Sequence, residues 1–467
     1  MTYWERLLAE YVGGGDSPIS PTLIAKSITN NGTYNAVDDE ADGYSSVSVN
    51  VPDIVYYKND VTFYDYDGTI IASYSAAEFA ELTEMPANPT HTGLISKGWN
   101  WTLADANTFV AAHGFLPIGQ CYDPVDDKLR IDIELVPETL SPYLCLGVNG
   151  TAVVDWGDGT ATDTITGSST SSAYYTPQHT YTAAGKYTIT VDITGEARIL
   201  STTGTNGACR ILTATNVAPS YEQQNAVYKS AVVGVHLCSK VTLSAHAFKN
   251  LYSLSYITFD TTRTSIDRWF DGCMGLTTLI FPPSATSIGT VAMGLSGLCV
   301  VSLAKTNSFA AVSAFDDCYS LKELAMPEDT AETTAICSAC YSMTRSNIPS
   351  TWTKVKGAIF CKARSLRSVV IPSGVTEIES QAFSECWSLA ELDIPDSVTT
   401  IATYAFDKCY SLKFIKFHSA TPPTVSNLNT FGSLPTTCTI YVPTGSLADY
   451  TSASNYPSSS SYTYVEY

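Results

Sequence analysis

The chain has 467 residues and a formal net charge of −20, from 45 Asp and Glu against 25 Lys and Arg. Nucleic acids and anionic membranes bind basic surfaces, so this charge argues against both as partners. No apolar run reaches the ~18 residues that span a bilayer, and we expect no membrane insertion. Only 15% of the residues are charged, whereas 45% are apolar and 29 are Tyr. This composition predicts a mainly β, multidomain protein rather than a helical bundle.

Residues 1–53 are predicted to be a small N-terminal attachment segment. Residues 3–11 can form a short amphipathic helix, and three glycines at 13–15 then make a joint. The start of the chain has no basic stretch followed by an apolar core, so we expect no secretory signal there. An Asn31-Gly32 turn and alternating valines predict a hairpin within residues 28–52. The motifs NGTYNA and ADGYSSVSVNVP resemble a module of tail and baseplate proteins of phages that infect gut Gram-positive bacteria.

Residues 54–125 open with VTFYDYDGTII, in which a turn at Tyr66-Asp67-Gly68 predicts a hairpin. Two further stretches follow it, PANPTHTGL and then GWNW. Their order resembles that of the internalin B-type repeat, which implies a β-grasp-like module. Asp65 and Asp67 are candidate calcium ligands, but the other acidic positions of an EF-hand loop are missing. We favour a simple turn.

Residues 126–204 contain VVDWGDGT, then QHTY and GKYTITV, in which apolar residues alternate as in a half-buried strand. These motifs resemble the polycystic-kidney-disease domain. The resemblance implies an Ig-like β-sandwich of about seven strands that acts as a spacer. His179 is a candidate catalytic or metal residue, but in that family it is a structural residue bonded near the Asp-Gly turn, which we favour.

Residues 205–467 form a repeat array. A Leu or Met recurs every 22 or 23 residues, usually with a Phe six residues before it and often a Cys three before it. Units this small cannot bury their own apolar side, so they must stack into a solenoid. The aligned residues are Leu254, Leu276, Leu298, Leu321, Met343, Leu366, Leu389 and Leu412.

The consensus AFxxCxSLxxIxIP resembles the BspA-like leucine-rich repeat, which implies a leucine-rich-repeat solenoid with a C-terminal cap. We expect residues 231–237 to begin the solenoid or its N-terminal cap, and Phe431 and Tyr441 to close its last coil. The chain has 13 Cys. Recurrence at one repeat position predicts buried, reduced thiols for Cys273, Cys318, Cys340, Cys386 and Cys409.

No recognised catalytic frame contains any of the six His, and no phosphate-binding or dinucleotide motif occurs. We therefore predict a protein without enzymatic activity, catalytic residues, cofactor or metal site. The remaining class of function is binding. The residues at the outward positions of the coils differ in type from coil to coil, as on a binding surface, although an ordinary solvated surface varies in the same way. The candidate receptor-facing residues are Tyr256, Thr278, Glu323, Arg345, Asn347, Glu391, Asp393, Phe414 and Lys416.

A second row follows the Cys position and is rich in Tyr. Such rings suit recognition of a sugar or a protein, but they can also pack over the neighbouring coil, which we favour. The row runs Tyr252, Met274, Ser296, Tyr319, Tyr341, Arg364, Trp387 and Tyr410.

The leading hypothesis is a phage virion protein of the tail or baseplate region, exposed on the particle. Its N-terminal region would bind other virion proteins, and its solenoid would bind a host surface protein or glycan. Assembly into a homo-oligomer is left open. The alternatives are a bacterial cell-surface adhesin and a capsid decoration protein.

Overall fold

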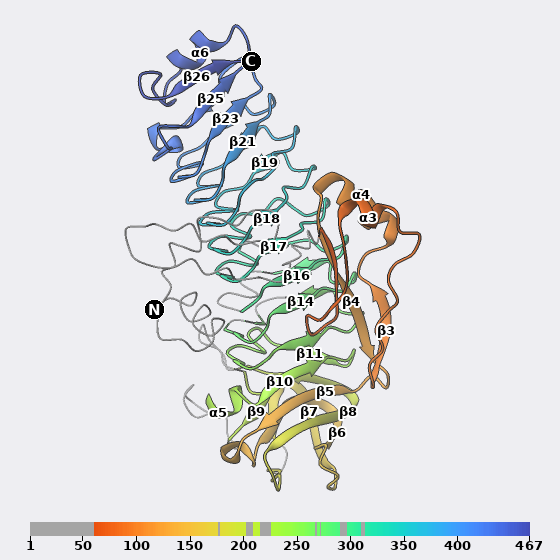
Figure 1. Ribbon diagram of the computed structural model, residues 1–467. Coiled ribbons are helices and arrows are strands. Elements are labelled where there is room, and N and C mark those ends of the chain that lie inside the picture. The colour runs from red at the N-terminus through yellow and green to blue at the C-terminus, as the bar shows by residue number, and fades with distance from the viewer. Residues whose placement is uncertain are drawn as a thin grey trace, which may run out of the picture. The chain divides into compact units, whose positions relative to one another are not determined.

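A computed structural model describes residues 60–175, 178–201, 209–214, 226–266, 269–270, 272–289, 297–309 and 313–467. The chain divides into two compact units, Met1–Lys58 and Asn59–Tyr467, and the described residues belong to the second. The helix expected at 3–11 and the hairpin expected within 28–52 lie outside them. The described chain is mainly β, with N-terminal sheet regions followed by a β-solenoid of about 10 turns (Figure 1). None of its helices is long and apolar enough to cross a membrane.

The first region is a four-stranded sheet of order β2-β1-β4-β3, which we call the N-terminal sheet. The hairpin predicted around Gly68 is present, because β1 and β2 pair antiparallel. Two helices pack Phe79, Phe109 and Val110 into the core of this sheet. The elements are β1 (Val61–Tyr64), β2 (Ile70–Tyr74), α3 (Ala76–Ala80), β3 (Leu94–Trp99), α4 (Leu103–His113) and β4 (Leu116–Pro124).

Of the two tryptophans in GWNW, Trp99 is the last residue of β3, whereas Trp101 lies beyond the strand. Helix α4 begins directly afterwards, because the Thr102 hydroxyl accepts a hydrogen bond from the Asp105 amide at 3.2 Å. It ends at His113, and the φ of 76° at the capping residue Gly114 suits a residue without a side chain. A capping residue and a closing glycine were the available sequence signals for this helix.

The second region belongs to an eight-stranded sheet in which β12-β10-β5-β8-β6-β7 are consecutive neighbours. Strand β10 pairs antiparallel with β5 and parallel with β12, so this sheet runs from the second region directly into the solenoid. It therefore crosses the boundary predicted at 204/205, and the domain boundaries remain predictions. The elements are β5 (Leu129–Leu135), η1 (Pro137–Thr139), β6 (Tyr143–Asp155), β7 (Asp163–Tyr175), β8 (Gly185–Ile199), β9 (Leu212–Thr213) and α5 (Ala226–Lys229).

The solenoid stacks its strands in two rows, which we call row A and row B (Figure 1). In row A, seven strands follow the repeat Leu or Met, namely β12 (Tyr256–Thr258), β14 (Thr278–Ile280), β16 (Val300–Ser302), β17 (Glu323–Leu324), β18 (Arg345–Ser346), β21 (Glu391–Ile394) and β23 (Phe414–Phe417). The row begins with β10 (Val232–His236) and ends with β25 (Thr439–Val442) and β26 (Thr463–Glu466). Row B contains β11 (Val241–Leu243), β13 (Ser265–Ile266), β15 (Ser287–Ile288), β19 (Lys354–Val355), β20 (Glu377–Ile378), β22 (Thr400–Ile401) and β24 (Thr424–Val425). Two helices lie near the end, η3 (Leu428–Phe431) and α6 (Leu447–Ser452).

The coil interior confirms the predicted repeat positions. The rings of Phe383 and Phe406 stack with centroids 5.5 Å apart, and Phe406 stacks on Phe431 at 5.8 Å. None of the 13 cysteines, which all lie in the described part of the chain, forms a disulfide, and 11 of them are buried. Buried among them are the five repeat cysteines Cys273, Cys318, Cys340, Cys386 and Cys409.

The ends of the solenoid differ from the expectation at one point. Strand β10 begins row A, as expected for residues 231–237. Phe431 is buried in the interior, but Tyr441 points outward and contacts the Phe414 ring at 5.9 Å. Strand β26 then pairs parallel with β25. Row A therefore extends one strand past the strand that contains Tyr441.

Candidate binding face

Row A alternates buried and outward side chains, as the pleat of a strand requires. In β21 the buried residues are Leu392 and Ile394, and the outward residues are Glu391 and Asp393. The same alternation places Ile415 and Phe417 inward and Phe414 and Lys416 outward in β23. The outward side chains of successive coils therefore share one face, which is the candidate binding face.

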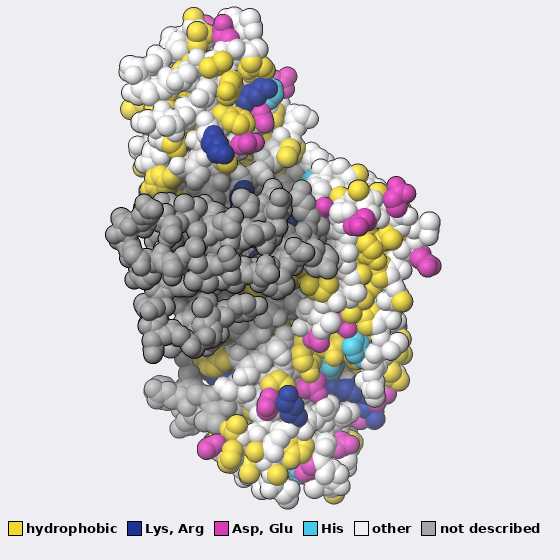
Figure 2. All heavy atoms as spheres, in the orientation of Figure 1, with side chains coloured by type: hydrophobic (Ala, Val, Ile, Leu, Met, Phe, Trp, Pro, Cys, Tyr) yellow, Lys and Arg dark blue, Asp and Glu magenta, His cyan; other side chains and the backbone are white. Residues whose placement is uncertain are grey.

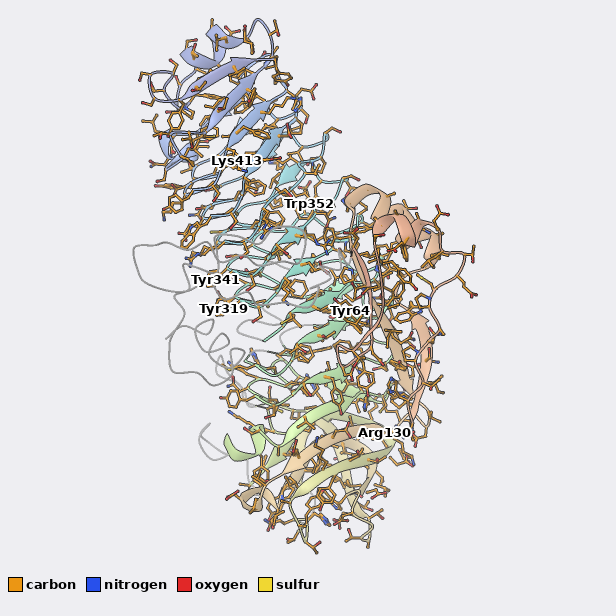
Figure 3. The ribbon with its side chains drawn as sticks, in the orientation of Figure 1. Tyr64, Arg130, Tyr319, Tyr341, Trp352 and Lys413 are labelled. Atoms are coloured by element: carbon orange, nitrogen blue, oxygen red, sulfur yellow. The ribbon has the colours of Figure 1, made fainter. Side chains whose placement is uncertain are left out.

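The N-terminal sheet covers the first part of this face, since β4 lies against β12, β14 and β16. The contact is closely fitted, because a Cβ at Gly119 would lie only 2.4 Å from the Ile280 side chain. The buried Asn100 amide donates to the Ser302 carbonyl at 3.2 Å, and the Trp101 indole donates to the Leu303 carbonyl at 2.6 Å. Figure 3 shows Tyr64 of this sheet beside the coils.

Three candidate residues lie in the covered part or beside it. Thr278 is 3% exposed. The ring of Tyr256 lies 5.2 Å from that of Tyr66 in the N-terminal sheet, and its hydroxyl donates to Asp132 at 2.8 Å. Asn347 is 4% exposed and bonds both the amide and the carbonyl of Met326.

Two further candidates form an ion-paired group with the N-terminal sheet. Arg345 lies 2.6 Å from Glu323 and 3.3 Å from Asp60. Its guanidinium also lies 5.0 Å from the centre of the Phe115 ring. These contacts occupy Arg345 and Glu323, and we do not carry the five covered or engaged residues forward as receptor-facing.

The later coils leave the face open. Glu391 and Asp393 are exposed, Phe414 and Lys416 are half-buried, and Val370 is 80% exposed. In Figure 2, hydrophobic, basic, acidic and His side chains lie close together over the C-terminal coils. We call the outward surface of residues 368–373, 391–396, 414–418 and 439–467 the open face. The structure thus groups four of the predicted residues there.

The open face contains a hollow of about 520 Å³. Its apolar side is formed by Val369, Val370, Ile371 and Pro395, and its polar side by Ser373, Asp393, Asp396 and His418. A solvent-exposed valine between acidic groups is unfavourable in water, so covering it with a partner would release ordered solvent. Sequence reasoning did not select Val370, although an apolar residue at an outward repeat position is a signal.

One chain of hydrogen bonds orders the polar side of the hollow. His418 Nε2 lies 3.1 Å from Asp393, and His418 Nδ1 lies 3.1 Å from the Tyr467 hydroxyl. Burial and the negative charge of Asp393 raise the pKa of Tyr467, so its hydroxyl stays protonated at neutral pH. The Lys416 ammonium lies 4.0 Å from the centre of the Tyr467 ring. Tyr467 had no sequence signal, since its position depends on the pairing of β26.

The aromatic row is a stack along the coils. Tyr319 and Tyr341 lie 5.0 Å apart and nearly parallel, on neighbouring coils (Figure 3). The Arg364 guanidinium lies between Tyr341 and Trp387, at 4.6 and 4.0 Å from their ring centres, and Tyr410 follows Trp387 at 6.1 Å. The ring faces are thus turned toward one another, which favours packing over the next coil. Ser296 lies outside the described residues.

The arrangement does not suggest covalent or metal chemistry. Ser373, His418 and Asp393 share the hollow, but both nitrogens of His418 already have partners, so neither can act as a base toward Ser373. In the N-terminal sheet, the Asp65 carboxylate bonds the Tyr66 amide and His91, and Asp67 bonds the Thr69 amide. The hydrogen bond expected between His179 and the Asp-Gly turn is present, at 2.9 Å from Asp158. In the described part of the chain, no group of three or more His, Cys, Asp or Glu is placed to hold a metal.

Comparison with protein families agrees with the repeat geometry. The family model of the BspA type leucine-rich repeat region matches residues 241–337 and 333–434, in 6 copies. Residues 241–434 are a BspA-type leucine-rich repeat region. A search of curated proteins gives no match.

Part of the chain is similar to solved structures of bacterial proteins. A leucine-rich repeat protein from Bacteroides ovatus is 18% identical with a TM-score of 0.41, over 50% of this chain and 66% of that one. The pneumococcal vaccine antigen PcpA is 17% identical with a TM-score of 0.34, over 50% and 67%. A leucine-rich cell surface protein from Faecalibacterium prausnitzii is 17% identical with a TM-score of 0.27, over 56% and 94%. The chain thus spans about two thirds of the first two proteins.

Proposed function

We propose that this protein is a non-enzymatic, surface-exposed binding protein that recognises a macromolecular partner through the open face. The observation that carries the proposal is the hollow beside Val370. Its apolar side includes this exposed valine, and its polar side includes Asp393, Asp396 and His418. Leucine-rich repeats are regular scaffolds whose outward positions can vary without disturbing the core. Here these positions combine apolar, acidic and basic groups, as a specific interface does.

Two biological settings fit this proposal. In the first, the chain is displayed on a bacterial cell as an adhesin, which the BspA-type repeats favour. In the second, it is a phage virion protein, and the support is the resemblance of residues 28–52 to tail and baseplate modules. In both settings the regions 54–125 and 126–204, which resemble an internalin B-type β-grasp module and a polycystic-kidney-disease domain, would act as a spacer. Attachment to other virion proteins through residues 1–53 belongs to the second setting, and nothing favours capsid decoration.

Binding of the labelled full chain to a panel of bacterial and mammalian epithelial cells tests the proposal. Val370→Asp places a charge on the apolar floor and should reduce binding at least 10-fold, since about 1.4 kcal/mol corresponds to that factor. Val125→Asp is the matched control, because Val125 is also exposed but lies outside the open face. Binding to epithelial cells favours the adhesin, and binding to bacteria favours the virion protein. Equal binding by both variants would reject the open face as the binding surface.

A further inference from the structure

A second and larger hollow, of about 890 Å³, lies where β5 and β8 meet the first coils of the solenoid. We call it the junction pocket. Residues from β5 and β8, from the turn before β10 and from the loop before β12 line it, and none of them belongs to the open face. Its volume lies within the range of about 300–1,000 Å³ typical of pockets that hold small organic ligands.

The side chains that line the junction pocket suit a ligand rich in hydroxyl groups. Ser230, Ser253 and Ser255 contribute hydroxyls that can both donate and accept hydrogen bonds, and Asp132 and Glu134 contribute carboxylates that accept them. An apolar ligand would strip these groups of water without replacing their hydrogen bonds, which is costly. An anion would face the two carboxylates, while Lys186 lies 3.9 Å from Glu134 and offsets one of them.

One of the carboxylates is already held in a fixed orientation. Asp132 Oδ1 accepts from the Thr188 hydroxyl at 2.5 Å and Oδ2 from the Tyr256 hydroxyl at 2.8 Å, with His236 Nε2 at 3.4 Å. Each oxygen has two lone pairs, so Oδ1 can accept one further hydrogen bond, whereas Oδ2 already faces both Tyr256 and His236. Burial by itself would raise the pKa of Asp132, but the hydrogen bonds from His236, Thr188 and Tyr256 outweigh it and lower that pKa. The Asp132 carboxylate is therefore an ionised acceptor in a fixed orientation, so it needs little rearrangement when a ligand binds.

The pocket also has an aromatic wall. Tyr256 lines the pocket on the side of Asp132, to which its hydroxyl donates at 2.8 Å, and its ring lies over Gly234, where a Cβ would be only 2.1 Å away, so both ends of this side chain are positioned. An aromatic ring attracts the C–H groups of a sugar ring through its electron-rich face. Fixed acceptors, several hydroxyls and an aromatic wall are together the chemistry that recognises a polyhydroxylated ring.

We propose that the junction pocket binds a neutral oligosaccharide, with Asp132 and Glu134 accepting hydrogen bonds from its hydroxyls. This site is independent of the open face, so its ligand and the partner proposed above can be distinguished by separate variants.

Titration calorimetry of the full chain with maltotriose, cellotriose and chitotriose tests the proposal. At least one of these trisaccharides should bind with a dissociation constant of about 1 mM or lower. The double variant Glu134→Gln/Ser253→Ala should weaken that binding at least 10-fold, whereas Val370→Asp should leave it unchanged. Both replaced side chains lie at the surface of the pocket, and equal melting temperatures would show that the double variant folds.

Three results would overturn the proposal. The first is no heat of binding for any of the three probes at about 10 mM. The second is equal affinity of the wild-type chain and the double variant. The third is loss of trisaccharide binding in Val370→Asp, which would assign the ligand to the open face.

Discussion

The Cys409 thiol donates a hydrogen bond to the carbonyl oxygen of Phe383, 3.3 Å away on the preceding coil. The same carbonyl accepts the backbone amide of Cys386 in its own coil at 3.2 Å. Each coil can thus use both lone pairs of one Phe carbonyl, one within the coil and one for the next coil. The relationship recurs in the pairs Cys273–Phe248, Cys340–Phe315 and Cys386–Phe360.

Replacing this thiol should separate its polar role from its apolar one. Cys409→Ala loses the S–H···O bond and leaves a small cavity, so we expect a loss of about 1–2 kcal/mol in the free energy of unfolding. Cys409→Ser keeps a donor near the Phe383 carbonyl and should cost less than Cys409→Ala. Urea unfolding of the two variants measures the difference. If the site were merely apolar, the serine variant would be the less stable of the two.

The state of the thiols predicts an alkaline loss of stability. Burial raises the pKa of Cys121 to about 12 and that of Cys438 to about 11, from an ordinary value of 9.0. A raised folded-state pKa contributes stability that is fully present below pH 9 and is lost as pH rises toward 11–12. The urea midpoint should therefore fall as pH rises from 9 to about 11–12, the interval between the unfolded and folded pKa values.

Thiol titration at pH 8 gives an independent check. In the native chain only Cys299 and Cys361, which are partly exposed, should react readily, and all 13 thiols should react in denaturant without reductant. Fewer reactive thiols after denaturation would reveal disulfides and contradict the reduced state of the cysteines.

The stacked Phe column should be essential to the C-terminal coils. Phe406 lies between Phe383 and Phe431 in the interior, so Phe406→Ala should cost about 3–5 kcal/mol through lost burial and a cavity. Tyr410→Ala, at a side chain that is 51% exposed, is the control and should cost less than about 1 kcal/mol. Because coils contact mainly their neighbours, limited proteolysis should cut residues 390–467 before residues 129–199. Simultaneous cleavage of both regions would show that the damage spreads through the whole core.

The contact between the N-terminal sheet region and row A should weaken in acid. Glu328 bonds His113 of α4 and the amide and hydroxyl of Ser350. Burial alone would raise the pKa of Glu328, but the bonds from Ser350 and His113 outweigh it and hold that pKa below the ordinary 4.5. A lowered folded-state pKa contributes stability that is present above pH 4.5 and is lost as pH falls below it. Glu328→Gln should flatten the fall in melting temperature between about pH 5 and pH 3, and an unchanged slope would assign the acid sensitivity to other carboxylates.

The sequence by itself determined the solenoid and its interior. Repeats of 22 or 23 residues can bury their apolar side only by stacking, so the positions of Phe383, Phe406 and Cys409 followed from spacing alone. The hairpin around Gly68 followed equally from local turn chemistry. These features depend on residues close in the chain or on a strict period, which a pattern records.

The tertiary structure decided which part of row A is accessible. Thr278 and Glu391 occupy the same outward position in two different coils, two residues after the repeat Leu, yet Thr278 is buried and Glu391 is exposed. The difference comes from Asn100, Trp101 and Gly119, which are 161 to 202 residues from the coil residues that they contact and carry no period that relates them to those coils. The hydrogen bond between Tyr467 and His418 and the pairing of β5 with β10 are likewise long-range contacts. Such contacts depend on the fit of complete surfaces, and a local sequence pattern does not encode that fit.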